Sequence, residues 1–580
     1  MMLQPAASAA DRRNVPDHIP PKRSSQIRNG FGINSDMPRE PYLPWQRWWW
    51  TRMFDAGVSW IRIGQYENSS DPTSWDWVEQ KRGVFQVAPE ADDYVDSLVD
   101  NGVQIQVQLM YGNPMYTSPS GIKPDSITPA NGSFHNPDRS LYSVFWAPTT
   151  PEQIEAFTRY VRWMVNHFKG RIRYYALWNE QDIDYWNPKG NPEEYGRLLK
   201  AFIPAVHETD PDAKVIYGGQ ADPVRDFTRR AFATCQCASG IDVYAYHTYP
   251  GYGRNLNPET MDTNAYGKES PAKLRELVRH YPGIKPDIPF WDDEFNSIGA
   301  WDGSDDTVQA KYVPRGMIYN WAAGVRTFVW LLAAGTDGNE YDDFGLIHGL
   351  RNLPDDFTAR PVFAAVQNTN AVFSDTKPDP SIKIQTPDVP ELQKKSEYPF
   401  FAYGFRSPSG KAVVAYWIGA HSKPRNVFPR IQGDLRISNS GIEHPVLIDI
   451  ASGAIRALPW KQGAPDTLES VPLKDSILAV ADESYIDWPV LPEAPSGLAA
   501  ASTGNGVKLS WQMHGGNAKS ALVERRDGNT GSWSTLTTQP ASQTEYADGR
   551  ASPGQVSCYR VTAVNDAGRS AYSNIARVPR

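Results

Sequence analysis

The chain has 580 residues, 40% of them hydrophobic and 20 of them tryptophan, which suits a well-filled core divided among two to four domains. Its formal net charge of −8, without long basic runs, argues against nucleic acid as a partner. No apolar run reaches membrane-spanning length. Of the three cysteines, Cys235 and Cys237 stand too alone for a zinc site, and the odd total indicates no redox compartment.

Residues 1–30 are polar and proline-rich, and we expect an irregular lead-in. From residue 31 the hydrophobic period alternates between 2 and 3.6. Strands are predicted at residues 31–34, 60–64, 103–109, 172–177, 214–218, 241–246, 290–294 and 325–332. Helices are predicted at residues 44–56, 91–100, 151–168, 191–209, 222–234, 270–280, 307–323 and 359–373.

Eight strand–helix pairs in order predict an α/β fold, a (β/α)8 TIM barrel over residues 31–374. A doubly wound sheet would give a similar alternation, but the first strand lacks a glycine-rich phosphate turn. The connection over residues 111–150 is long and rich in proline, glycine, asparagine and serine. A loop of this length inside a compact domain indicates a functional segment.

The pattern becomes all-β after residue 374. Short strands at 412–417, 446–450 and 477–480, separated by turn residues, predict an accessory antiparallel β-sandwich over residues 375–488. Residues 489–495, rich in proline, indicate a stiff linker. In the last segment, residues 496–580, the runs 507–511 and 558–565 resemble strands of a fibronectin type III module.

Two acidic residues follow strands of the predicted barrel. Glu180 comes after the fourth strand, directly behind Asn179, and Glu294 ends the seventh. The carboxyl ends of all barrel strands meet at one rim, so both carboxylates could face one bound sugar. Glycoside hydrolysis needs such a pair, one acid to protonate the leaving oxygen and one to attack the sugar or activate water. The amide of Asn179 could bind a sugar hydroxyl.

Other polar and aromatic residues are predicted near Glu294, which must be ionised to act as a nucleophile. Arg62 after the second strand and Tyr249 beyond the sixth could stabilise its charge. His247 shares the face of Tyr249 and could bind a hydroxyl or orient a carboxylate. Trp330 on the eighth strand could stack on the sugar. Alternatively, Arg62 is a buried ion-pair partner, His247 a hydrogen-bonded wall residue and Trp330 part of the core.

Four motifs together carry a resemblance to a known group of enzymes. They cover residues 111–116 (YGNPMY), 177–180 (LWNE), 210–215 (DPDAKV) and 242–249 (DVYAYHTY). Residues 31–375 resemble a clan A retaining glycoside hydrolase, in particular glycoside hydrolase family 39 and its bacterial exopolysaccharide-cleaving relatives. The resemblance implies Glu180 as acid/base and retention of anomeric configuration, with Glu294 as nucleophile and neither metal nor organic cofactor.

The chain departs from this family pattern beside both acids. Gln181 follows the acid/base where such enzymes usually carry proline, and Asp292 and Asp293 stand where threonine often precedes the nucleophile. If Asp292 points inward, three acids crowd one site and raise one another's pKa. Asp292 is then either paired with a basic group such as Arg62 or is the alternative nucleophile.

Aromatic residues are frequent in the loops expected at the catalytic rim, and the sequence predicts that Trp186 and Trp301 among them bind substrate. The set is Trp75, Trp77, Tyr111, Tyr116, Trp146, Tyr185, Trp186, Tyr252 and Trp301. Several platforms in a row favour an endo-acting enzyme on a polysaccharide or oligosaccharide. The alternatives are an exo-acting β-glycosidase of the β-xylosidase type, a non-catalytic carbohydrate-binding barrel, and an adhesion protein built around the last module.

Export is expected mainly because of this substrate class. The first ten residues lack the basic region and long apolar core of a complete signal peptide, but their small residues resemble the last part of one. The sequence therefore predicts a secreted or periplasmic protein.

Overall fold

The structure is a computed structural model. It describes residues 15–35, 37–38, 46–64, 71–119, 124–127, 143–223, 226–250, 257–259, 271–297, 306–330, 332, 344–347, 359–393, 397–422, 428–529, 531–551 and 555–578.

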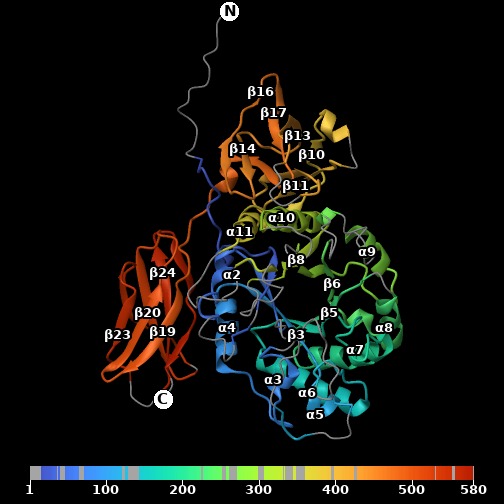
Figure 1. Cartoon of the computed structure of the whole chain (residues 1–580), viewed down its shortest axis with the longest axis vertical. Helices are drawn as coiled ribbons and strands as arrows, with labels where there is room; N and C mark the ends of the chain where they lie inside the picture. Colours follow the sequence, from blue (N-terminus) through green and yellow to red (C-terminus); the bar gives the residue numbers. More distant parts are fainter. Residues whose placement is uncertain are drawn as a thin grey trace, which may run out of the picture.

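A closed barrel of eight parallel strands forms the first part of the chain, as predicted (Figure 1). Its strands are β1 (Gly32–Asn34), β2 (Trp60–Ile63), β3 (Gln104–Leu109), β4 (Tyr174–Leu177), β5 (Lys214–Gln220), β6 (Val243–Thr248), β7 (Phe290–Phe295) and β8 (Val325–Val329). β1 pairs with both β2 and β8, which closes the sheet on itself. The closure excludes an open doubly wound sheet.

Helices follow the strands and surround the barrel. They are α2 (Arg52–Asp55), α3 (Trp75–Val78), α4 (Pro89–Asp100), α5 (Pro114–Thr117), α6 (Pro151–His167), α7 (Pro192–His207), α8 (Phe227–Cys235), α9 (Pro271–Val278), α10 (Asp306–Ala322) and α11 (Pro361–Phe373). Short 3-10 turns lie at η1 (Ser24–Gln26), η2 (Ala238–Gly240), η5 (Pro390–Gln393) and η6 (Glu483–Ile486).

Capping residues at the starts of α6 and α7 explain why these two helices could be predicted well from the sequence. Thr150 caps α6 by accepting the N–H of Gln153 at 3.3 Å, and Gln153 Oε1 accepts the N–H of Thr150 at 3.1 Å. Asn191 caps α7 by accepting two backbone N–H groups at 3.1 Å each. Both helices carry proline at the first turn, where no hydrogen bond is lost.

The structure corrects the predicted helix over residues 44–56. Among the described residues 46–56, Gln46 and α2 are helical, and a turn lies between them at residues 47–51. Trp48, Trp49 and Trp50 are all buried, although three consecutive helical residues would sweep around much of the helix circumference. The turn buries all three. α3 and α5 lie in segments without a helical prediction.

The barrel interior has two layers, which set the place of the site. The layer toward the amino ends of the strands is apolar and consists of Trp60, Ala176, Ile216, Val243, Ala245, Trp291 and Phe328. The layer toward the carboxyl ends is polar and buried, with Asn34, Arg62, Gln106, Gln108, His247 and Asp293. Alternate residues of one strand therefore contribute to both layers, for example Trp60 and Arg62 on β2.

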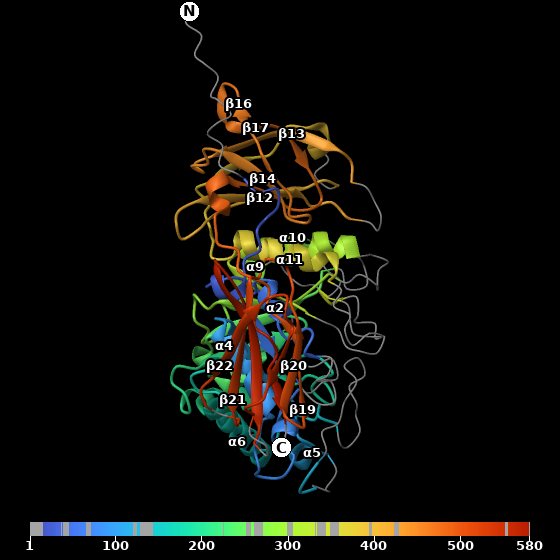
Figure 2. The same cartoon turned by 90° about the vertical axis from the view of Figure 1, so that its left-hand side faces the viewer.

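Two antiparallel sheets follow the barrel, consistent with the predicted β-sandwich. The strands are β9 (Lys377–Pro378), β10 (Lys383–Gln385), β11 (Phe400–Arg406), β12 (Ala412–Ile418), β13 (Ile431–Ser438), β14 (Pro445–Asp449), β15 (Ile455–Ala457), β16 (Trp460–Lys461), β17 (Ala464–Leu473) and β18 (Leu478–Asp482). The sheet orders are β10-β13-β17-β16 and β15-β14-β18-β12-β11-β9. Both views place these sheets beside α10 and α11 (Figures 1 and 2).

The last part is a second pair of antiparallel sheets. Its strands are β19 (Ser496–Thr503), β20 (Gly506–Gln512), β21 (Ser520–Asp527), β22 (Ser534–Pro540), β23 (Glu545–Asp548), β24 (Ser557–Asn565), β25 (Gly568–Tyr572) and β26 (Ala576–Val578). This part docks on α4, where Arg526 lies 2.8 Å from Asp93 and Tyr572 donates to Asp100 at 3.0 Å. It is therefore fixed to the barrel side.

The described part of the predicted lead-in also packs against the folded body. Ile19 donates its N–H to Gly453 O at 2.8 Å, and Trp488 donates to Pro20 O at 3.1 Å. In the described residues, no helix has both the length and the apolar character needed to cross a membrane.

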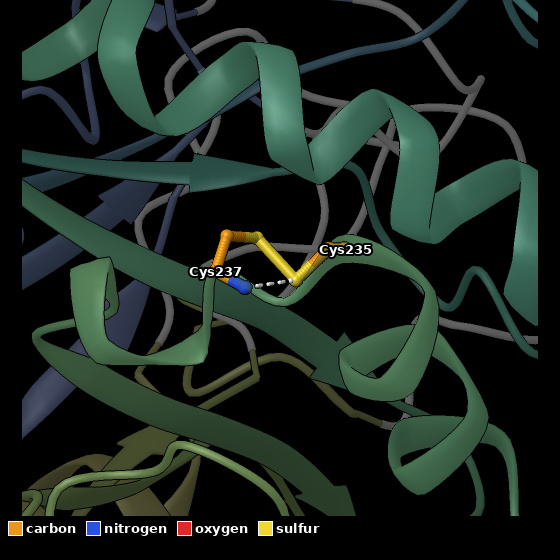
Figure 3. Close-up of a disulfide and its surroundings, with 2 residues drawn as sticks. All are labelled: Cys235 and Cys237. Atoms are coloured by element: carbon orange, nitrogen blue, oxygen red, sulfur yellow. Dashed lines mark hydrogen bonds between the residues drawn. A yellow bond between two sulfur atoms is a disulfide. The ribbon is translucent and has the colours of Figure 1, made fainter.

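Cys235 and Cys237 form a disulfide at the end of α8 (Figure 3). The sequence interpretation, which left these cysteines without a role, missed this bond. Gln236 between them adopts a left-handed φ of 52°, and the N–H of Cys237 lies 3.0 Å from Cys235 Sγ. The tight turn brings the two sulfurs together across a single intervening residue.

Candidate active site

The polar layer at the carboxyl ends of the strands contains the candidate site. Glu180 follows β4 and Glu294 lies near the end of β7, as the sequence predicted. Both are buried, with 8% and 2% of their surface exposed. One oxygen of each carboxylate and a ring nitrogen of His247 lie within 4.8 Å of one another. The two predicted acids therefore converge.

Arg62 connects most of the site. Its Nη1 donates to Glu294 Oε2 at 3.0 Å and to Asn34 Oδ1 at 2.7 Å. Its Nη2 donates to Asn179 Oδ1 at 2.7 Å. Its Nε lies 3.4 Å from Asp293 Oδ2. Arg62 thus lies beside Glu294, where the sequence placed it, and it is also a buried ion-pair partner.

β7 contains an irregularity that places two consecutive acids inside the barrel. Its register shifts against β6 between Tyr246 and His247, and against β8 between Asp292 and Phe295. Strict alternation from Trp291 would put Asp293 inside and Glu294 outside. The extra residue in β7 turns Glu294 inward as well, as β-bulges beside active sites do.

Asp292 points away from the site. Its carboxylate accepts the backbone N–H of Thr248 at 3.1 Å, the hydroxyl of Thr248, and Asn320 Nδ2 of α10 at 2.9 Å. It lies between the sheet and the helix layer, so it is neither the partner of Arg62 nor an alternative nucleophile. Asp293, together with Glu294, pairs with Arg62.

Asp293 is completely buried and held by three side chains. Besides Arg62, Gln106 Nε2 donates to its Oδ2 at 2.6 Å, and His247 Nε2 lies 3.4 Å from its Oδ1. Burial alone would raise the pKa of Asp293, but the charges of Arg62 and His247 with these hydrogen bonds lower it below the usual value. Asp293 is therefore an ionised carboxylate.

His247 bridges the acids. Its Nδ1 lies 2.8 Å from Glu180 Oε1 and 3.4 Å from Glu294 Oε2. Burial disfavours the charged ring, but Glu294, Asp293 and Glu180 together raise the pKa of His247 to about 10. The ring is therefore protonated at neutral pH, and its positive charge lies among the three acidic side chains.

A metal ion among Glu180, His247 and Glu294 would require His247 to lose its proton. The three residues could present one ligand atom each. A protonated imidazole, however, has no lone pair to donate to a metal. The arrangement fits a cation supplied by the protein itself.

The backbone around Glu180 is unusual and is fixed by its neighbours. Trp178 and Glu180 have left-handed φ angles of 64° and 49°. The N–H of Glu180 donates to Gly219 O at 2.9 Å. A side chain at Gly219 would overlap His247 Nε2 and Asp293 Oδ1, so the close approach of β5 to the site requires glycine there. Residues with such φ values often mark functional positions.

The amides beside Glu180 are also in place. Asn179 Oδ1 accepts from Arg62 and from Gln108 at 3.1 Å, and its Nδ2 donates to Tyr111 OH at 3.3 Å. Gln181, where the family pattern has proline, is buried and donates to Gly218 O at 3.0 Å. It ties the chain after the acid to β5 and leaves the site geometry intact.

Tyr249 and Trp330 border the nucleophile side. Tyr249 OH donates to Glu294 Oε1 at 2.7 Å, and burial beside Glu294 raises its pKa far above the usual value, so the hydroxyl keeps its proton. The ring of Trp330 lies edge-on to Tyr249, with centroids 6.3 Å apart, and packs on Phe344 at 4.9 Å. Only 5% of Trp330 is exposed.

The structure contradicts the prediction that Trp186 binds substrate. It is fully buried, donates to Glu194 Oε2 at 2.9 Å and packs between Trp178 and Tyr195. Its ring belongs to the core because the turn after Glu180 folds back over α7. Trp301, also predicted to bind substrate, lies outside the described residues.

Most other rim aromatics are core residues as well. Trp75, Tyr111, Tyr116 and Tyr185 are buried. Trp75 donates to Glu79 at 2.7 Å and stacks on Tyr116 at 5.2 Å. Trp77 and Trp146 are half-buried, and Tyr252 lies outside the described residues. The expected row of exposed platforms therefore shrinks to Trp77 and Trp146 in the described part of the rim.

Sequence reasoning missed three polar residues of the site, Asn34, Gln106 and Gln108, and noted Asp293 without giving it a role. A signal existed on β3, where Gln106 and Gln108 alternate with apolar residues in a strand that is otherwise buried. Two buried amides on one face of a barrel strand indicate a polar partner inside the barrel.

The fold has clear structural relatives. A structure described as a family 39 glycoside hydrolase from the gut symbiont Bacteroides cellulosilyticus WH2 is 16% identical, with a TM-score of 0.55 over 79% of this chain and 82% of that chain. A structure described as a bacterial orthologue of human α-L-iduronidase is 14% identical, with a TM-score of 0.50 over 96% of this chain and 97% of that chain.

At the level of sequence, no protein-family model and no curated protein matches the chain. The structural likeness, at these low identities, establishes the fold. The chain has the fold of these two proteins, a closed eight-stranded barrel followed by antiparallel β-sheets.

Proposed function

We propose that the chain is a retaining glycoside hydrolase that cleaves O-glycosidic bonds by double displacement. The observation that carries this proposal is the convergence of Glu180, His247 and Glu294, whose polar atoms lie within 4.8 Å of one another. Retaining enzymes place their two carboxyl groups about 5–5.5 Å apart, whereas inverting enzymes leave about 6.5–9.5 Å for a water molecule. The observed spacing supports direct attack by a carboxylate.

Glu294 is the proposed nucleophile. Arg62 and Tyr249 each donate to one of its oxygens, at 3.0 and 2.7 Å, and hold the carboxylate in place. Glu294 attacks the anomeric carbon while the glycosidic bond breaks, and Glu180 gives its proton to the leaving oxygen. Glu180 then removes a proton from water, which attacks the same carbon and releases Glu294.

The residues around the pair have proposed substrate contacts. The Asn179 amide is held by Arg62, Gln108 and Tyr111, so it is fixed before a sugar arrives. Fixed donors stabilise charge that develops in the transition state without reorganising. His247 and Tyr249 position the acids and line the same space, and Trp330 offers an apolar edge to the sugar ring.

Endo action on a polysaccharide is the finer proposal, and exo action of the β-xylosidase type is the alternative. The buried rim aromatics remove part of the original argument for endo action. Trp77 and Trp146, which are half-buried at the rim, support endo action as platforms for further sugars. Product analysis over time separates the two, since an endo enzyme releases oligosaccharides first.

The proposal is tested by screening bacterial and plant polysaccharides and aryl glycosides. We expect hydrolysis by the wild type and a loss of more than about a thousandfold in Glu294→Gln, with unchanged thermal unfolding. Glu276→Gln, an exposed glutamate on α9, is the matched control and should keep full activity. Near-normal activity of Glu294→Gln would refute the assignment. Sugar binding without any hydrolysis would favour a non-catalytic carbohydrate-binding or adhesion protein.

The remaining proposals concern location and the last module. The Cys235–Cys237 disulfide supports a secreted or periplasmic protein, because disulfides persist mainly in oxidising compartments. Residues 496–578 form a three-stranded sheet and a second sheet around β24, which suits the proposed fibronectin type III relationship. Its ion pairs with α4 support a role as a fixed part of the enzyme rather than a free spacer.

A further inference from the structure

A separate cavity of about 480 Å³ lies at the amino-terminal ends of the barrel strands. Its lining includes Tyr174 at the start of β4, Lys214 at the start of β5, Trp291 on β7, Arg326 on β8 and Lys377 on β9. The acids of the candidate active site lie at the opposite ends of the same strands. The apolar interior layer around Trp60 and Trp291 separates the two places.

Arg326 is the central cation of this cavity. Its guanidinium lies 4.1 Å from the ring centroid of Trp60 and 5.1 Å from that of Trp291. Its Nε donates to Gly30 O at 3.1 Å and its Nη2 to Asn29 Oδ1 at 2.5 Å. Both acceptors are neutral, and within the described residues Arg326 has no carboxylate partner.

The charge of Arg326 is retained despite its surroundings. Burial lowers the pKa of Arg326, opposed by the nearby Tyr174, to about 10, so the group is still protonated at neutral pH. A largely buried charge without a counter-charge is costly and is normally compensated by a partner. The guanidinium also keeps N–H groups beyond the two used for Gly30 and Asn29.

The other charged residues of the lining add to the positive charge. Lys377 and Lys214 are exposed at the edge of the cavity. The one acid among the lining residues, Asp242, binds His207 at 3.2 Å and Lys285 at 3.1 Å, with Lys214 at 3.8 Å. The carboxylate of Asp242 is therefore paired with these neighbouring basic residues. The residues that line the cavity carry a net positive charge.

We propose that this cavity binds the carboxylate of a sugar-sized acid, such as a uronic acid, with Arg326 as its main contact. A planar guanidinium pairs with a carboxylate through two parallel hydrogen bonds. The cavity volume falls within the range of about 300–1,000 Å³ of small-molecule sites and exceeds the need of one inorganic ion. Tyr174, Phe290 and Trp321 give the lining an apolar part that suits the C–H faces of a sugar ring.

The test is a calorimetric titration of the whole protein with glucuronate, with glucose and sulfate as comparison ligands. We expect saturable binding of glucuronate and much weaker binding of glucose and sulfate. Arg326→Gln should weaken glucuronate binding about tenfold or more, as loss of a charged hydrogen-bonding partner does. Lys377→Gln should weaken it about two- to fivefold. Lys508→Gln, an exposed lysine of the last module, should have no effect.

Unchanged glucuronate binding in both cavity variants would overturn the proposal. Equal affinity for glucose would remove the role of the carboxylate, and equal affinity for sulfate would overturn the assignment to a sugar acid. Because Lys377 is exposed, its variant keeps the test valid if Arg326→Gln fails to fold. The site is independent of the proposed hydrolysis, so Glu294→Gln should retain glucuronate binding whether or not the enzyme assignment holds.

Discussion

Nδ1 of His247 lies 2.8 Å from Oε1 of Glu180, so a buried cation stands directly beside the carboxyl group that we assign as acid/base. The other ring nitrogen lies 3.4 Å from Asp293 Oδ1. One histidine therefore connects the proposed acid/base to a carboxylate that takes no part in bond exchange. This arrangement holds three acidic side chains close together around one cation.

The first prediction concerns the pH dependence of stability. The pKa of His247 is raised from 6.5 to about 10 on folding, so its contribution is fully present below pH 6.5 and is lost as the pH rises through 10. His247→Gln should therefore be less stable than the wild type at pH 6, and the difference should shrink toward pH 10. Urea unfolding at several pH values measures this difference.

His280→Gln is the matched control, because His280 is an exposed histidine that also contacts a glutamate. Its stability should differ little from the wild type across the same range. A stability difference for His247→Gln that stays constant between pH 6 and 10 would contradict the protonated state of His247.

The second prediction assigns Asp293 a positioning role. Asp293→Asn keeps the size of the side chain but removes the negative charge next to His247 and Arg62. His247 then loses its proton more easily, so the basic limb of the pH profile of kcat/KM should move down by about one pH unit. A uniformly lower rate with an unmoved profile would show that Asp293 matters only for packing.

The third prediction concerns the acid/base. Glu180→Ala should slow turnover most for substrates with poor leaving groups and least for activated aryl glycosides, which need no proton. Added azide should restore part of the rate, since a small anion can occupy the space of the missing carboxylate and attack the glycosyl-enzyme. Equal slowing for all leaving groups would contradict the role of Glu180.

Much of the site could be predicted because strand ends are strong signals. Glu180 and Glu294 each follow an apolar run, and a barrel brings the ends of all strands to one rim. The alternation of Trp60 with Arg62 and of Ala245 with His247 likewise follows from the strand period. The inward-facing positions of these residues could be predicted once the strands had been located.

The remaining features depend on packing that sequence does not show. The extra residue in β7 decides that Asp293 and Glu294, and not Asp292, face the site, and no local pattern in Asp292–Glu294 marks it. Trp186 is an aromatic residue of the kind that stacks on sugar rings, but its ring is buried by the turn that follows Glu180. The Cys235–Cys237 disulfide depends on the left-handed Gln236 between the two cysteines.

The fourth prediction concerns the contact between the barrel and the β-sandwich. Glu259, in the connection after β6, forms a buried ion pair with Arg315 of α10 at 2.5 Å and accepts from Trp417 of β12 at 2.6 Å. Glu259→Gln leaves Arg315 without its counter-charge, so the free energy of unfolding should fall by about 3–5 kcal/mol. Chemical denaturation measures the loss.

Glu276→Gln again serves as the control, because its ion pair with Arg279 is exposed. Its stability should change by less than about 1 kcal/mol. If the two variants were equally stable, Glu259 would not join the barrel to the β-sandwich energetically.

The most direct test of the proposed double displacement is the configuration of the first product. Proton NMR of the anomeric signal, recorded during cleavage of a glycoside from the substrate screen, distinguishes the two outcomes before mutarotation. The spacing of Glu180 and Glu294, with polar atoms within 4.8 Å, predicts that the first sugar released has the same anomeric configuration as the substrate. Initial release of the inverted anomer would contradict Glu294 as a nucleophile.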